Sequence, residues 1–272
     1  MVWAGGRCFL VAQTTREVAF GWRNAPGLLL KEAVTVRPPL GEREHSIFRS
    51  YLAMRAAIGA LGILLPVVLL LGDRWILKGS ASARGSLSAY YHSGMRDYFV
   101  ATLVVVGFLL ILYKIFERSQ DNTLSTVAGV AAILVAFFPT ELSGDGVLTP
   151  LQDRIGEETC EIIHYAAASV LFAVLARLSW LFGEREGKRG ERPKLVRGPH
   201  PSATGRRVFH QASALIVTVA VLFILLTRWV DLFGDWDLLI GESVAIIAFG
   251  LSLAYKGAEL DMLVPSMARR SA

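Results

Sequence analysis

Long apolar blocks, separated by short polar segments, dominate the pattern of this chain. Six blocks, with charges only near their ends, reach the length of about 20 residues that a helix needs to cross the roughly 30 Å hydrocarbon layer of a bilayer. They cover about residues 52–72, 98–116, 123–140, 161–182, 209–230 and 237–256. The pattern therefore predicts an all-α fold, a polytopic bundle of six transmembrane helices.

The connecting segments differ in their content of Lys and Arg, and this difference predicts an orientation. Residues 1–55, 114–118, 183–208 and the segment from Lys256 onward hold 21 of the 28 Lys and Arg residues, whereas the alternate segments hold six. Because basic loops stay on the cytoplasmic side, both termini are predicted to be cytoplasmic. We expect a multi-pass protein of the plasma (inner) membrane.

The blocks and their flanks divide the chain into three parts. Residues 1–51 are predicted to form a basic cytoplasmic extension, residues 52–257 the six-span domain and residues 258–272 a cytoplasmic tail. The loop 183–208 is rich in Gly, Pro and Arg and is predicted to be flexible. It either sets the orientation only or also attracts anionic lipid headgroups. No aromatic residues interleave with its charges, so we expect the lipid bilayer as partner and no nucleic acid.

Composition agrees with this class and excludes others. Hydrophobic residues make up 53% of the chain and charged residues only 19%, with a formal net charge of +5. Soluble domains carry about 25% charged residues. Cys8 and Cys160 are the only cysteines, which excludes a disulfide scaffold.

Small residues recur at helical spacing in two of the predicted spans. They are Ala128, Ala132 and Ala136 in the third span and Gly241, Ala245, Ala248 and Ser252 in the sixth. Such stripes let helix backbones approach closely, so we interpret them as packing surfaces. Pro66 is expected to kink the first span and Pro139 to end the third.

The segment GSLSAYYHSGMRDYFV at 85–100 is the most distinctive stretch outside the spans. Its tyrosines, Tyr90, Tyr91 and Tyr98, suit the level of the lipid headgroups. With the outer ends of the fourth and sixth spans it predicts a polar extracytoplasmic pocket for a lipid headgroup, a small polar ligand or a partner. The candidate pocket residues are Ser88, Tyr91, His92, Arg96, Asp97, His164 and Glu242.

Two alternatives use the same residues. Glu161 and His164 share a helical face and predict, together with His92, Asp97 and Glu242, a site for a divalent metal such as zinc. Such a metal would activate water in a membrane hydrolase acting on lipid. Glu242 is also the candidate coupling carboxylate of a small ion- or proton-coupled transporter. Against both, acids are favoured at helix N-termini without any ligand.

The blocks SLSAYYHSGMRDYFV, AGVAAILVAFFPT, IIHYAAA and ESVAIIAFGLSLAYKG occur in this order. With them, residues 52–257 resemble an uncharacterised bacterial family of six-span integral membrane proteins, which implies the same architecture and no particular activity. The arrangement is also similar to the six-helix group that includes stress-linked autophagy modulators. Ser88, His92, Asp97 and His164 look like the set of the alkaline-ceramidase and adiponectin-receptor superfamily, and this similarity implies a zinc hydrolase.

Overall fold

A computed structural model describes residues 42–77, 83–113, 120–141, 148–189, 203–227 and 234–261. Within these ranges the chain is helical and has no strand, which confirms the predicted all-α class. The long helices are α1 (Glu42–Leu71), α2 (Arg96–Leu112), α3 (Gln120–Phe137), α5 (Glu157–Arg189), α6 (Ala203–Thr227) and α7 (Asp237–Asp261). The short elements are the π-helical turn η1 (Gly72–Ile76), the 3-10 turns η2 (Ser88–His92) and η3 (Gly234–Trp236), and α4 (Pro150–Ile155).

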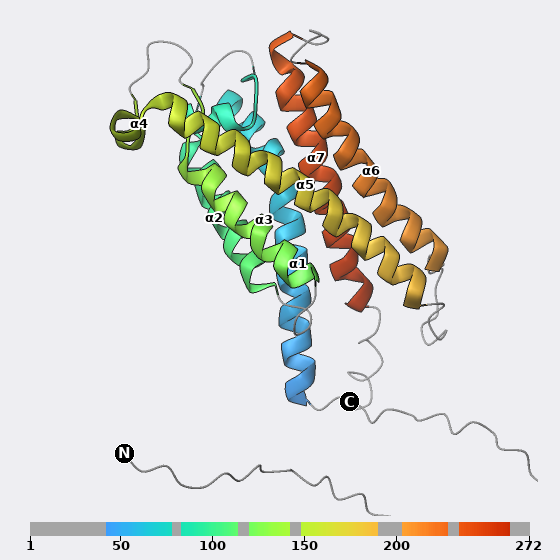
Figure 1. The fold of residues 1–272 in the computed structure, drawn as a ribbon. Coiled ribbons are helices and arrows are strands. Elements are labelled where there is room, and N and C mark those ends of the chain that lie inside the picture. The colour runs from blue at the N-terminus through green and yellow to red at the C-terminus, as the bar shows by residue number, and fades with distance from the viewer. Residues whose placement is uncertain are drawn as a thin grey trace, which may run out of the picture. The chain divides into compact units, whose positions relative to one another are not determined.

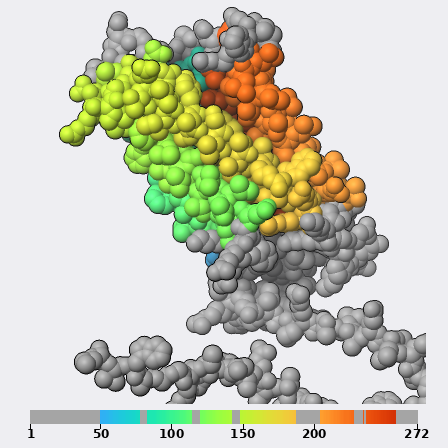
Figure 2. All heavy atoms as spheres, in the orientation of Figure 1, coloured from blue at the N-terminus to red at the C-terminus, as the bar shows by residue number. Residues whose placement is uncertain are grey.

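The long helices form a closed ring in which each packs against two neighbours. α1 packs against α2 and α7, α3 lies between α2 and α5, and α6 lies between α5 and α7. Figure 1 shows α5 crossing in front of the bundle, and in Figure 2 its side chains separate those of α3 from those of α6. Successive helices alternate in direction. We call the end of the bundle where η2 lies the η2 end and the other the opposite end.

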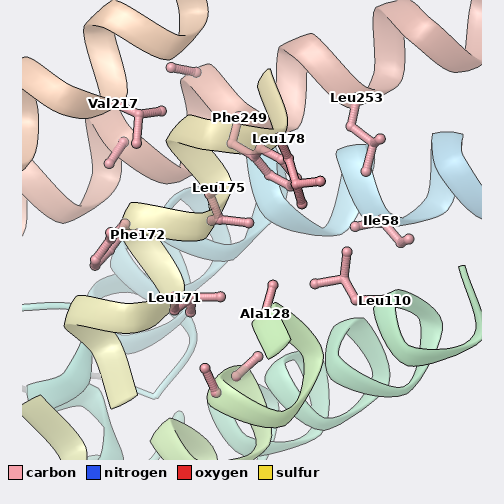
Figure 3. Packing of buried hydrophobic residues seen from close by; sticks show 14 of the residues in the cluster. Ile58, Leu110, Ala128, Leu171, Phe172, Leu175, Leu178, Val217, Phe249 and Leu253 are labelled. Carbon is pink, nitrogen blue, oxygen red and sulfur yellow. The ribbon is translucent and has the colours of Figure 1, made fainter. Parts of the chain in front are cut away.

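Small and apolar side chains fill the centre of the ring (Figure 3). Every long helix contributes to this core; examples are Ile58, Leu110, Ala128, Leu178, Val217 and Leu253, in the order of their helices. The two stripes of small residues in α3 and α7 are buried along their length. They therefore have the packing role that their spacing predicts.

Five helical segments are long and apolar enough to cross a membrane. They are Ser50–Ile76, Gln120–Phe137, Glu157–Glu186, Thr204–Thr227 and Asp237–Lys256. These segments overlap the first, third, fourth, fifth and sixth predicted spans and support the membrane class. The second predicted span, 98–116, corresponds to α2, which has 17 residues in the described part of the chain.

The helices extend beyond the predicted spans at the opposite end. The chain divides after Leu40 into two units, of which the first lies outside the described residues; α1 begins at Glu42, inside the predicted extension 1–51. α5 continues to Arg189 and α6 begins at Ala203, so both flanks of the predicted loop 183–208 are helical. Charged side chains of α5 and α6 pair between these extensions. Because the extensions carry charges, the hydropathy pattern alone does not predict that they are helical.

The turn structure at the η2 end follows local sequence signals. α3 ends at Phe137, two residues before Pro139, as predicted. α4 begins with a capping box, in which Thr149 and Gln152 exchange side-chain and backbone hydrogen bonds, and Pro150 takes the first helical position. This short helix lies in a segment that the hydropathy pattern assigns to a loop.

Candidate functional site

The segment around η2 is packed into the end of the bundle. Tyr90 and Tyr91 are only 1% and 6% exposed and lie in a cluster with Leu65, Phe99 and Val135. Both side chains therefore point into the bundle and not toward the surrounding lipid. Burial also raises the pKa of the Tyr90 hydroxyl above its usual value of 10.0, so it stays protonated.

A chain of hydrogen bonds links η2 to α5 and to the end of α3. His164 lies 2.8 Å through Nε2 from the Ser88 hydroxyl and 2.6 Å through Nδ1 from the Phe138 carbonyl oxygen. A carbonyl oxygen only accepts hydrogen bonds, so Nδ1 carries a proton and donates a hydrogen bond to it. With a neutral imidazole, the Ser88 hydroxyl then donates to Nε2. His164 thus has a fixed tautomer and joins two segments far apart in sequence.

α7 holds the same turn through its own side chain and backbone. The Leu87 backbone N–H donates to the Glu242 carboxylate at 2.7 Å, and the Leu239 N–H donates to the Gly85 carbonyl at 2.9 Å. Glu242 is buried. A buried carboxylate needs such donors, and here the turn supplies them.

The remaining predicted pocket residues make separate contacts. His92 Nε2 lies 2.9 Å from the Thr140 carbonyl oxygen, which also accepts from the Gln152 amide at 3.1 Å. Arg96 donates to the Tyr91 hydroxyl at 2.9 Å and lies over its ring. The structure thus brings Ser88, His164 and Glu242 to one turn, while His92 and the Tyr91–Arg96 pair flank it.

The five residues predicted as metal ligands, His92, Asp97, Glu161, His164 and Glu242, do not come together. In the described ranges, no three His, Cys, Asp or Glu side chains form a possible metal site. Both ring nitrogens of His164 already have partners, and the Glu242 carboxylate accepts from backbone. Asp97 is exposed, and Glu161 is partly buried one turn before His164. The predicted zinc-type centre is therefore not formed.

A cavity of about 800 Å³ lies beside this turn, between the end of α1 and the start of α7. Its lining is Leu70, Leu71, Asp73, Arg74, Ala83, Tyr90, Trp236, Leu239, Ile240, Ser243 and Val244. None of the predicted pocket residues lines it. Its lining comes from two segments far apart in the sequence, 70–90 and 236–244, so no local sequence motif predicts it.

The lining of the cavity is mostly apolar and includes a few polar side chains. Asp73, only 3% exposed, is ion-paired with Arg84 at 3.5 Å, and Arg84 in turn lies over the Tyr90 ring. The Ser243 hydroxyl oxygen is buried and has no hydrogen-bond partner among the described residues. A mostly apolar space with a few polar groups in its lining matches an amphiphilic ligand.

Charged side chains are also buried at the opposite end. The Glu186 carboxylate of α5 binds Arg206 of α6 at 2.9 Å and also Lys256 of α7. His210 Nδ1 lies 2.8 Å from the Ser252 hydroxyl. Glu186 and His210 are both 0% exposed.

The same end holds a second group on α1, α2 and α3. Asp121 is ion-paired with Arg185 of α5. Arg55 donates to the Tyr51 hydroxyl at 2.9 Å and lies over the rings of Tyr51 and Tyr113. Arg55 is only 5% exposed, so its side chain points into the bundle.

We refer to Arg55, Asp121, Arg185, Glu186, Arg206, His210, Ser252 and Lys256 as the opposite-end charge network. A signal for it exists in the sequence, because charges of opposite sign follow one apolar block and precede the next, as Glu186 and Arg206 do. Intramembrane ionisable groups are candidates for function.

Comparison of the chain with family models, with curated proteins and with solved structures finds no match, so the family resemblance stays a prediction.

Proposed function

We propose that this protein is a six-span integral membrane protein that binds an amphiphilic ligand, a membrane lipid, in the cavity at its η2 end. In this proposal both termini are cytoplasmic and the η2 end faces the extracytoplasmic side of the plasma membrane. The observation that carries the proposal is the cavity between α1 and α7, with its mostly apolar lining and the polar side chains of Asp73, Arg74 and Ser243.

The six-span topology rests on α2 in addition to the five long apolar helices. A helix of 17 residues spans about 25 Å, close to the thickness of the hydrocarbon layer. α2 also completes the ring between α1 and α3, and beyond its first turn its exposed large side chains, Val105, Phe108 and Leu112, are apolar. The unequal distribution of Lys and Arg supports the orientation.

A lipid is the occupant that the cavity favours. Leu71, Trp236 and Val244 line the cavity and are 42 to 49% exposed, so its rim is continuous with the apolar surface that faces the bilayer. Asp73 and Arg74 follow the last turn of α1, at the level expected for headgroups. An acyl chain would occupy the apolar part while the headgroup meets the charged side chains.

The residues that the two other candidate functions, a zinc-type hydrolase and a transporter, would require do not support them. The zinc-type hydrolase needs a ligand set that the described residues do not form. A transporter with Glu242 as coupling carboxylate needs that carboxylate on a ligand path, whereas it accepts a hydrogen bond from the Leu87 N–H and does not line the cavity. We therefore assign Glu242 to holding the η2 turn in place.

Photo-cross-linking tests the binding proposal. A phospholipid with a diazirine in its acyl chain should label the cavity peptides around Leu70 and Leu239, and an excess of unlabelled lipid extract should suppress this labelling. Exposed positions on α6, such as Leu215 and Val219, face bulk lipid and serve as the control. The unlabelled lipid should not prevent labelling of these positions. Labelling of α6 alone would contradict the proposal.

Cysteine labelling tests the topology. In a background with both native cysteines replaced by Ser, Asp153→Cys on α4 and Arg207→Cys on α6 introduce thiols at exposed positions of the two ends. An impermeant maleimide should label Asp153→Cys in intact cells and Arg207→Cys only after the membrane is permeabilised. Labelling of both positions, or of Arg207→Cys alone, in intact cells would contradict the orientation.

A further inference from the structure

We propose that the lipid in the cavity at the η2 end is a phospholipid, whose phosphate binds Arg74 and whose ester carbonyl accepts a hydrogen bond from Ser243. This inference rests on the proposed function, because it names the class of lipid that the same cavity takes. Three observations carry it: the engagement of the lining carboxylate, the unpartnered donors beside the cavity, and the level of these groups along the helices.

The two charged side chains of the lining differ in what they offer a ligand. Asp73 is only 3% exposed, and its carboxylate is ion-paired with Arg84 at 3.5 Å. A carboxylate that already has a cation beside it does not require a second one from a ligand. Arg74 is exposed, and the five N–H donors of its guanidinium can bind a ligand in addition to a contact inside the protein. The charged part of the lining therefore selects a ligand with acceptor oxygens.

Two buried donors at the cavity have no hydrogen-bond partner among the described residues. One is Ser243 Oγ, which belongs to the lining. The other is Arg84 Nε, and the Arg84 guanidinium lies beside Asp73 and over the Tyr90 ring, both of which belong to the lining. Buried polar atoms are nearly always bonded, so these donors indicate an acceptor in a ligand or in water. Phosphate and ester oxygens are such acceptors, and guanidinium groups match the geometry of phosphate.

Two tryptophans mark the level of Arg74 in the membrane. Trp75 follows Arg74 directly and is 69% exposed, and Trp236 lines the cavity and is 49% exposed. Tryptophans are enriched at the level of the lipid headgroups, which is where phospholipids carry their phosphates. Ser243 lies six residues after Asp237, the first residue of α7, which is about 9 Å along the helix axis. Arg74 is therefore placed for the phosphate, and Ser243 for an ester carbonyl deeper in the membrane.

These two positions distinguish a phospholipid from other amphiphiles. A diacylglycerol has the same ester carbonyls and no phosphate, so it would bind Ser243 and leave the Arg74 guanidinium to water. A phospholipid binds both groups, and its hydrogen bonds with Arg74 are charge-assisted, which makes them stronger than hydrogen bonds between neutral groups.

Titration of the delipidated full chain with defined lipids tests the proposal. In neutral-detergent micelles, native mass spectrometry measures the binding of dioleoyl-phosphatidylglycerol, dioleoyl-phosphatidylethanolamine and dioleoylglycerol, which share their acyl chains. We expect both phospholipids to bind at least about tenfold more tightly than dioleoylglycerol. The zwitterionic phosphatidylethanolamine separates recognition of the phosphate from attraction of a net negative charge.

Variants locate the two contacts. Arg74→Gln should remove the preference for phospholipids and leave the binding of dioleoylglycerol unchanged, because Arg74 is exposed and does not belong to the core. Ser243→Ala should weaken the binding of all three lipids. Arg154→Gln removes an exposed cation from α4, at the same end of the bundle but outside the cavity lining, and should change neither property.

The outcomes separate this inference from the proposed function. Equal binding of dioleoylglycerol and the phospholipids by wild type would overturn the phospholipid assignment and leave the lipid cavity in place. A preference limited to phosphatidylglycerol, or one that persists in Arg74→Gln, would also overturn the assignment of the phosphate to Arg74. Unchanged binding of all three lipids by Ser243→Ala would overturn the ester contact. If wild type binds none of the three lipids, both the inference and the proposed function fail.

Discussion

Gly59 of α1 and Gly250 of α7 lie backbone against backbone. A Cβ atom on Gly59 would lie 2.7 Å from the Gly250 carbonyl oxygen and 2.7 Å from the Ala254 nitrogen, so the two helices would have to separate. A Cβ atom on Gly62, one turn later on α1, would lie 3.7 Å from its nearest neighbours, which is ordinary van der Waals contact. The closeness of this helix pair therefore depends on one glycine of α1 and not on the other.

We predict that Gly59→Ala destabilises the protein by about 1–3 kcal/mol, because the added methyl group meets backbone atoms that cannot move aside alone. The matched substitution Gly62→Ala should be neutral or slightly stabilising, since Ala favours helix. Reversible unfolding in mixed micelles measures both free energies. Equal effects of the two substitutions would contradict the proposed close contact.

Glu242 holds the η2 turn through the Leu87 N–H, and the two substitutions Glu242→Leu and Glu242→Gln separate its roles. Leucine removes the acceptor, so the Leu87 amide should exchange its hydrogen at least about tenfold faster, the equivalent of about 1.4 kcal/mol of local stability. Glutamine keeps an acceptor oxygen and should retain most of the protection. Hydrogen exchange of the peptide covering 85–92 measures both; unchanged protection in Glu242→Leu would show that the turn is held by other contacts.

Ser88→Ala should leave the Nε2 atom of His164 buried and without a partner. We expect a loss of about 1–3 kcal/mol in the free energy of unfolding. Ser86→Ala is the control, because the Ser86 hydroxyl accepts only from the nearby Ala89 N–H in a partly buried position. A larger loss for Ser86→Ala than for Ser88→Ala would argue against a structural hydrogen bond to His164.

Glu186→Gln should be among the most damaging single substitutions in the chain. The change keeps the shape of the side chain but leaves Arg206 and Lys256 buried without their carboxylate, at a cost of about 3–5 kcal/mol. Glu184→Gln, two residues earlier, affects a carboxylate that accepts from an exposed Trp180 indole, and should stay within about 0.5 kcal/mol. Similar unfolding free energies for the two variants would refute the buried ion pairs.

The central parts of the helices could be predicted from the sequence because apolar blocks of span length carry the information locally. The stripe of Ala128, Ala132 and Ala136 likewise predicts a contact face from spacing alone. The ends could not be placed this way. The helix ends depend on ion pairs between two helices, such as Glu186 of α5 with Arg206 of α6. Each charge is neutralised only when both helices extend to the same level.

The candidate site was predicted in part. Ser88, His164 and Glu242 meet at one turn although they come from three separate segments, since all three lie at the same end of alternating helices. Their role differs from the expectation, because each forms hydrogen bonds inside the protein. The cavity residues Asp73 and Ser243 carry no local signature and become neighbours only through the packing of α1 against α7.

The measurement that tests the account most directly is native mass spectrometry of the protein extracted from its own membrane in mild detergent. Wild-type protein should retain a bound lipid. Ser243→Phe, which fills the cavity from α7, should lose it, whereas Val219→Phe on the exposed face of α6 should retain it. Wild-type protein without bound lipid, or equal lipid retention by wild type and Ser243→Phe, would contradict a lipid-binding cavity at the η2 end.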